Sequence, residues 1–242
     1  MGGAAMNADV TFLADTALAI VRAVPVTLGL FVASAIGASL LGGGLVAALT
    51  AGLAPVRGIA RGWIFLFRGT PLLLQIFMVY YGLAALGPVR QGPFWPAFRD
   101  PLFCAGLAMT CCCSAYIAEV LRGALAAIPA GQIEAALACG MGRVTRLRLI
   151  VLPQMLRLAL PAYGNELVMM VKSTSLASTI TVLDVTGVAQ QVIAHSYRTL
   201  DVFCLAAGVY LGLTGALTAL LRWAERRLDP TVSDGAGEGA SR

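Results

Sequence analysis

The chain has 242 residues, of which 59% are hydrophobic and 12% are charged, and its formal net charge is +5 at pH 7. Soluble domains carry about 25% charged residues, so the composition excludes an ordinary soluble protein and predicts an integral membrane protein built mainly of helices. The positive charge does not indicate a nucleic-acid partner, because the arginines cluster between apolar segments, as in the cytoplasmic loops of membrane proteins.

The residue inventory argues against a metal site and a nucleotide site. His195 is the only histidine, and Cys111–Cys113 are consecutive within an apolar run, so on a helix they point in different directions. We therefore expect these cysteines to be small packing residues. No GxxxxGK[ST] sequence occurs, and the single lysine, Lys172, is not in a glycine-rich loop, which predicts that the chain carries no P-loop ATPase.

Residues 1–15 are small and weakly acidic, and we expect a short, poorly ordered external tail there. They lack a basic segment and a small-residue cleavage site, so no removable signal peptide is expected. No charge occurs between Ala23 and Val56, and this run is long enough for a first span, since about 20 apolar residues cross a bilayer. Its many small residues predict close packing against other helices.

Three arginines, Arg57, Arg61 and Arg68, follow this run and outnumber the basic residues on its other side. Because basic residues mark cytoplasmic loops, they predict a cytoplasmic loop and an external N-terminus. Residues 67–83 predict a second span with Pro71 in its first turn, where proline is favoured. Residues 88–100 are proline-rich, contain a tryptophan, and predict an external loop.

Three further spans are predicted over residues 101–118, 155–176 and 202–221. At the inner end of the third span, Glu119 and Arg122 are three residues apart on one helical face, where they can pair. Residues 181–201 are amphipathic and predict a short external helix along the interface. The prediction is an all-α membrane protein with five transmembrane helices over residues 16–228, the N-terminus outside and the C-terminus inside. Residues 229–242 predict a disordered cytoplasmic tail.

The segment 132–153, QIEAALACGMGRVTRLRLIVLP, is a polar and basic interruption between two apolar spans. It predicts two short helices separated by Gly140 and Gly142, since glycine tolerates the positive φ of a helix end. An ordinary basic cytoplasmic loop would explain the arginines without any partner. The spacing is more specific: Glu134, Ala135 and Ala136 precede Gly140, and Ile-Val-Leu-Pro ends at Pro153.

That spacing resembles the EAA loop of ABC importer permeases. Four blocks extend the resemblance to the polar amino acid permease family: residues 67–83, 115–142, 152–180 and 210–228. Within them, LPAYGNE and KSTSLA are similar to the histidine, lysine/arginine/ornithine and opine branch of that family. Cys139 departs from the aliphatic or small residue that is commoner at its position, which does not threaten the assignment.

The resemblance implies a type I ABC importer permease in the bacterial inner membrane. It implies a coupling loop over about residues 123–153 in which Glu134, Ala135, Ala136, Gly140, Gly142 and Pro153 contact an ATPase subunit. It also implies a dimer of ATPase subunits that binds ATP and Mg, a second permease subunit, and a periplasmic substrate-binding protein. Because this branch often uses two different permeases, we expect a heterodimer. This chain itself is expected to hold no cofactor.

Glu166 and Lys172 lie inside the fourth span, where a charge costs about 2.5–3.5 kcal/mol and so faces a cavity or a partner. Six residues separate them, which places them about 120° apart on a helix, so they need not pair. We expect Glu166 to meet a cationic group of the substrate, with Asn165, Lys172, Ser173 and Thr174 as further candidates for the substrate path. The alternative is that Glu166 pairs with an arginine or Lys172 to fix helix packing.

Three classes of function compete for this sequence. An intramembrane enzyme would need a nucleophile with its base, paired carboxylates or a metal cluster, and none is evident in the sequence. A secondary transporter is disfavoured because no internal repeat is convincing. The ABC permease reading remains, with basic amino acids or opines as substrates, or alternatively glutamine, glutamate or cystine.

Overall fold

The computed structural model describes the backbone of residues 2–228 and the side chains of residues 9–227, and within this part it is helical throughout with no strand. The predicted tail over residues 229–242 lies outside the described residues. The elements in chain order are α1 (Gly2–Arg22), α2 (Val24–Leu49), α3 (Ala54–Gly69), α4 (Leu72–Phe77), η1 (Met78–Gly82), α5 (Leu83–Ala85), α6 (Gly87–Arg90), α7 (Trp95–Phe98), α8 (Pro101–Ala126), α9 (Ala130–Ala138), α10 (Arg143–Arg146), η2 (Leu147–Val151), α11 (Leu152–Ser173), η3 (Thr174–Ile180), α12 (Val185–Ser196) and α13 (Thr199–Leu228).

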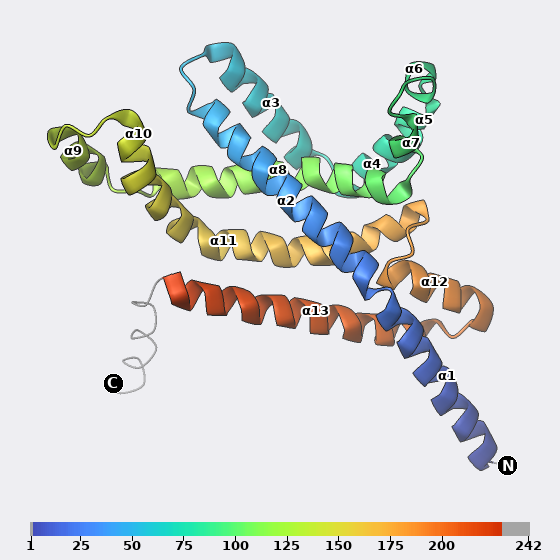
Figure 1. The fold of residues 1–242 in the computed structure, drawn as a ribbon. Coiled ribbons are helices and arrows are strands. Elements are labelled where there is room, and N and C mark those ends of the chain that lie inside the picture. Colours follow the sequence, from blue (N-terminus) through green and yellow to red (C-terminus); the bar gives the residue numbers. More distant parts are fainter. Residues whose placement is uncertain (1, 229–242) are drawn as a thin grey trace, which may run out of the picture.

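Five spans are compatible with this architecture. Among the described residues, three helical runs are long and apolar enough to cross a membrane, and two bent helix pairs raise the number to five if each is one span. In Figure 1, α8, α11 and α13 lie roughly parallel, and α2 crosses them obliquely. The helices α9 and α10 lie at one end of this bundle, and α12 lies at the other (Figure 1). The predicted all-α membrane fold is confirmed.

The core forms where α2, α8 and α11 meet. Ala38, Met109 and Val171 are buried there with the neighbouring apolar side chains of the same three helices. Gly42 permits a close approach, because a Cβ at this position would lie 3.0 Å from the carbonyl oxygen of Ser114 on α8. The close packing that the small residues predicted is therefore confirmed for α2.

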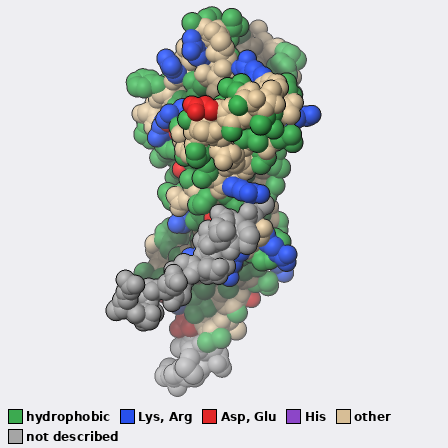
Figure 2. All heavy atoms as spheres, turned by 90° about the vertical axis from the view of Figure 1, so that its left-hand side faces the viewer, with side chains coloured by type: hydrophobic (Ala, Val, Ile, Leu, Met, Phe, Trp, Pro, Cys, Tyr) green, Lys and Arg blue, Asp and Glu red, His purple; other side chains and the backbone are tan. Residues whose placement is uncertain are grey.

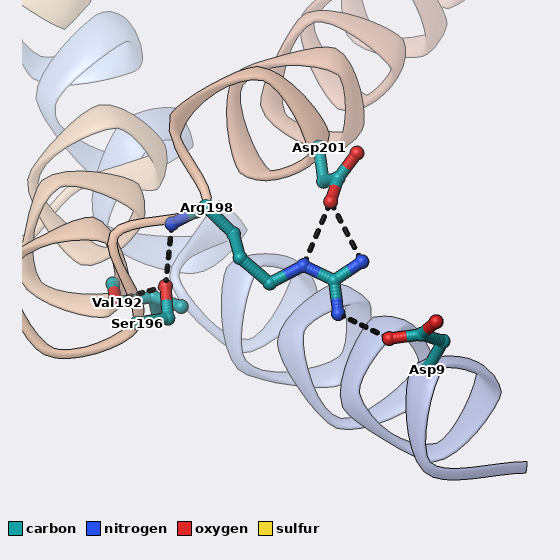
Figure 3. Close-up of polar contacts among 5 residues, drawn as sticks. All are labelled: Asp9, Val192, Ser196, Arg198 and Asp201. Carbon is teal, nitrogen blue, oxygen red and sulfur yellow. Dashed lines mark hydrogen bonds and ion pairs between the residues drawn. The ribbon is translucent and has the colours of Figure 1, made fainter. Parts of the chain in front are cut away.

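The N-terminal segment differs from the prediction. α1 begins at Gly2, so the expectation of a poorly ordered segment over residues 1–15 is wrong where the backbone is described. Arg198, between α12 and α13, explains part of this order: its Nη1 lies 2.7 Å from Oδ1 of Asp9, and its Nε donates to Asp201 at 2.8 Å (Figure 3). Its guanidinium carbon also stacks 4.6 Å from the centroid of the Phe12 ring. The two carboxylates raise the pKa of Arg198.

The segment that was predicted as a cytoplasmic loop also differs. Residues 54–69 form the helix α3, which the chain leaves through a 106° bend before α4. Pro71, which was predicted in the first turn of a span over residues 67–83, is instead the N-cap of α4 with an extended ψ of 136°. The helix begins at Leu72, and residues 67–69 belong to α3. The amide of Gln75 fixes this bend, because its Nε2 donates to the carbonyl oxygens of Phe67 at 3.0 Å and Thr70 at 3.1 Å.

The third span and the short helix expected between residues 181 and 201 agree with the structure, whereas residues 88–100, predicted as a loop, are partly helical. α8 begins at Pro101, and the short helix expected between residues 181 and 201 is α12. α11 begins at Leu152 and continues through the 3₁₀ turn of η3. The segment over residues 88–100 contains the short helices α6 and α7, and Arg90 stacks 5.9 Å from the ring centroid of Trp95.

Candidate functional site

The break after α9 is built by Gly140. Its φ is +71°, its N–H donates to Leu137 O at 2.9 Å, and the N–H of Met141 donates to Ala136 O at 3.0 Å. This pair of bonds is the Schellman motif, which ends a helix with a left-handed residue. Glycine suits the position because it has no Cβ to clash in that conformation. The predicted helix break at Gly140 is confirmed.

Gly142 acts differently from the prediction. Its φ is −63° and its ψ is 160°, which any residue can adopt, so no positive φ requires glycine here. It is the N-cap of α10, and its carbonyl oxygen accepts from the N–H of Arg146 at 2.9 Å. The first predicted short helix is confirmed as α9, which Gly140 ends. The second begins as α10 but is not a separate short helix, because it continues without a loop into η2 and α11.

The segment from α9 to η2 exposes a mixed surface. Glu134 and Ala135 are exposed, whereas Ala136 is buried at 4% exposure and packs inward. Four large apolar side chains of the segment are more than half exposed: Leu137, Val144, Leu147 and Leu149. Figure 2 looks onto this end of the molecule and shows basic side chains spread among hydrophobic ones. An apolar patch with a polar surround is typical of a protein–protein interface.

This surface is continuous with the membrane helices through α11. A cavity of about 440 Å³ lies between it and the end of α2, and Ile133, Arg143 and Arg146 face Val46 and Thr50 across it. α10, η2 and α11 follow one another without an intervening loop, so Arg143–Ile180 is one helical run. Pro153 follows the π-helical turn η2 almost directly, so its missing N–H falls where the regular α-helical hydrogen-bond ladder is already interrupted.

The candidate substrate residues are only partly brought together. Asn165 and Lys172 are exposed and Glu166 is half-buried on α11. The hydroxyl of Ser173 donates to Met169 O at 3.0 Å, and that of Thr174, which is fully buried, donates to Val171 O at 2.7 Å. Both hydroxyls therefore use their donors within the helix, and the structure assembles no polar band of all five residues.

Glu166 lies near Arg68, an arginine that was predicted to belong to a cytoplasmic loop. Among the described residues it makes no ion pair, with Lys172 or with any other cation. Arg68, at the bend between α3 and α4, lies within electrostatic range of it. The expectation that Glu166 and Lys172 need not pair is confirmed.

Arg68 also joins a charged cluster on α8 that sequence reasoning only half found. Arg122 Nη2 lies 2.7 Å from Glu119 Oε2, which confirms the predicted pair. Arg68 Nη1 lies 3.7 Å from the same oxygen, and its guanidinium carbon is 5.4 Å from the centroid of the Tyr116 ring. The signal that was missed is the Gly69-Thr70-Pro71 break, which ends α3 beside α8 rather than in a loop.

The chain resembles known transport proteins over most of its length. The model of a family described as "Binding-protein-dependent transport system inner membrane component" matches residues 40–234. The octopine transport system permease protein OccM of Rhizobium radiobacter is 46% identical over 235 residues, which are 95% of this chain and 96% of OccM. The histidine/lysine/arginine/ornithine transport system permease protein HisM of Escherichia coli strain K12 is 42% identical over 168 residues, 68% of this chain and 71% of HisM.

Two solved structures share the fold. A chain of an amino acid ABC transporter crystallised with histidines superposes with a TM-score of 0.77 at 28% identity and covers 86% of this chain and 94% of that one. A chain of the inward-facing MetNI methionine ABC transporter gives a TM-score of 0.71 at 18% identity, covering 88% and 97% respectively, and supports the fold alone.

Proposed function

The chain belongs to the binding-protein-dependent transport system inner membrane component family, and on that premise we propose that it moves basic amino acids or opines across the bacterial inner membrane. It is a permease subunit of an ABC importer for amino acids or opines, a transport component that is not itself an enzyme. Two relatives that cover two thirds or more of the chain are named for octopine and for histidine, lysine, arginine and ornithine, which supports this substrate class over glutamine, glutamate or cystine.

We propose that the ATPase subunit docks on the surface from α9 to η2. The exposed apolar side chains of this segment, with Glu134 beside them, supply the kind of patch that another protein covers. The partner ATPase, which would bind ATP and Mg, supplies the energy, and α11 carries the displacement toward Glu166. The second permease subunit is a homologous partner, which makes a heterodimer, and the N-terminus faces the periplasm.

The test of this function is co-purification followed by transport. The chain is tagged, extracted from native membranes in mild detergent, and its stoichiometric partners are identified by mass spectrometry. We expect an ABC ATPase and a second permease, and the same complex in proteoliposomes should take up L-arginine or octopine only when ATP and the binding protein are present. Uptake without ATP by the chain alone would contradict the proposal and revive a secondary transporter.

Glu166 is the residue that we propose to meet the cationic group of the substrate. It is half-buried in α11 and has no ion-pair partner among the described residues, so its carboxylate is available to a ligand. A charged hydrogen bond contributes about 1.5–3 kcal/mol, so Glu166→Gln should raise the KM for L-arginine uptake about tenfold or more. The control is Glu225→Gln, which removes an acid near the end of α13 and should leave the KM unchanged.

The Glu166→Gln variant distinguishes a role of Glu166 in substrate binding from a role in helix packing. Assembly is checked by size-exclusion chromatography of the complex, because a packing role would lower the yield and leave the KM of the surviving complex as it was. An unchanged KM and rate in an intact complex would remove Glu166 from the substrate path.

A further inference from the structure

A second cavity, of about 760 Å³, lies between the end of α2, α3 and α8. Arg61 and Arg68 of α3 and Arg122 of α8 line it, together with Glu119 and the apolar Ile64 and Phe65. Its volume falls within the range of about 300–1,000 Å³ that is typical of small-molecule sites. The substrate and coupling residues discussed above do not line it.

The charges of this cavity favour an anionic ligand. Glu119 is its one acid, and Arg122 already binds that carboxylate with both Nε, at 3.1 and 3.2 Å, and Nη2, at 2.7 Å. Arg68 adds a contact of 3.7 Å to the same group, yet the side chains of Arg68 and Arg122 remain 44% and 54% exposed. Arg61 makes no ion pair among the described residues. The cavity therefore offers more guanidinium N–H donors than the Glu119 carboxylate can accept.

Part of the cavity wall is apolar, and this part favours a ligand that has an apolar portion beside its charge. Phe65 is 82% exposed on α3, and Leu49 and Ile64 add further apolar surface to the wall. A free amino acid would gain nothing from such a wall, whereas a phospholipid presents a phosphate and an acyl chain side by side. Arginines with a neighbouring apolar surface match that amphipathic pattern.

The cavity lies at the basic end of the molecule. Thr50, at the C-cap of α2, lines both this cavity and the one beneath the proposed coupling surface, so the two lie at the same end of the bundle. The positive-inside rule assigns that end to the cytoplasm. The cytoplasmic leaflet carries anionic lipids that attract clustered arginines near the surface.

We propose that this cavity binds the headgroup of an anionic phospholipid of the cytoplasmic leaflet. The phosphate lies among the guanidinium groups of Arg61, Arg68 and Arg122, and an acyl chain lies along Phe65. None of the residues that line the cavity is among the proposed substrate contacts, although Arg68 also lies within electrostatic range of Glu166. Variants at Arg61 and Glu119 therefore test the lipid site without altering the residue on which the proposed function rests. It makes the permease sensitive to the lipid composition of its membrane.

The test is native mass spectrometry of the delipidated complex titrated with dioleoyl-phosphatidylglycerol, and with dioleoyl-phosphatidylcholine, which has the same acyl chains. We expect preferential binding of the anionic lipid. Arg61→Gln should weaken this binding about fivefold, since each arginine near an anionic lipid contributes about 1 kcal/mol. Arg57→Gln is the matched control, because it removes the same charge from α3 outside the cavity and should leave binding unchanged.

Glu119→Gln gives a result of opposite sign. It removes the only acid of the cavity and releases the donors of Arg122 and Arg68, so phosphatidylglycerol should bind more tightly to this variant. Equal binding of the two lipids to the wild-type complex would overturn the proposal, and this comparison requires no variant to fold. Equal losses in Arg61→Gln and Arg57→Gln, or displacement of the lipid by L-arginine, would also overturn it, the latter by assigning the cavity to substrate carboxylates.

Discussion

Substitution of Gly187 by alanine should prevent the chain from accumulating as a folded protein. Gly187 lies in the first turn of α12, where a Cβ would overlap the carbonyl oxygen of Val182. Its N–H donates to Oδ1 of the fully buried Asp184 at 2.8 Å, and Oδ2 of Asp184 accepts from the Tyr210 hydroxyl at 2.9 Å. Moving Gly187 away from Val182 would break this cap and leave buried polar groups unpaired, at a cost of roughly 3 kcal/mol.

The measurement for Gly187→Ala is the thermal stability and yield of the solubilised complex by fluorescence-detected size-exclusion chromatography. Gly43→Ala in α2 is the matched control, because a Cβ at Gly43 meets nothing within 4 Å. Alanine favours a helix interior over glycine by about 1 kcal/mol, so the control should keep or slightly raise stability. Equal thermal stability and yield of the two variants would show that the turn before α12 can shift to accommodate the added Cβ at little cost.

Glu134→Arg should abolish uptake while the permease remains folded. Glu134 is exposed in α9, and the nearby Arg143, Arg146 and Arg148 make it the lone acid of a basic surface. Reversing its charge within the proposed interface should cost about 3 kcal/mol of binding, or roughly a hundredfold in affinity for the ATPase. Because no described contact holds Glu134 in place, the stability of the permease itself should be unchanged.

The check on Glu134→Arg is the amount of ATPase recovered per tagged permease, together with ATP-driven uptake. Glu225→Arg serves as the control, since it makes the same charge change on α13, away from α9. Retention of a full complement of ATPase by Glu134→Arg would place the docking surface elsewhere on the chain.

The spans could be predicted because the cost of burying charge leaves long uncharged runs, as in the helix that begins at Pro101. The same rule failed for α3. It assigned Arg57, Arg61 and Arg68 to a loop, although a helix can carry arginines along one side and end at a break beside another helix. α1 was missed because part of its order comes from contacts with Arg198, a residue far along the chain.

The candidate site also combines features that could be predicted from the sequence with features that could not. Gly140 and the Glu119–Arg122 pair depend on spacings within one turn of helix, which a sequence displays directly. The contact between Arg68 and Glu119 joins two helices, and no local pattern encodes it. The constraint on Gly187 had a readable signal in the sequence LDVTG, an aspartate N-cap followed by a glycine in the first turn. The close Val182 carbonyl depends on the path of the turn between η3 and α12, which the sequence does not display.

The continuous helical run Arg143–Ile180 can act as a rigid rod within the permease. At about 1.5 Å per residue, Arg143 and Glu166 lie roughly 35 Å apart along a rod with no loop to absorb strain. A push at the proposed ATPase surface is therefore transmitted as displacement and rotation rather than as local deformation. The π-helical turn η2, at Leu147–Val151, and the prolines of α11, Pro153 and Pro161, interrupt the regular hydrogen-bond ladder between those residues. Any compliance of the rod is therefore concentrated at these places.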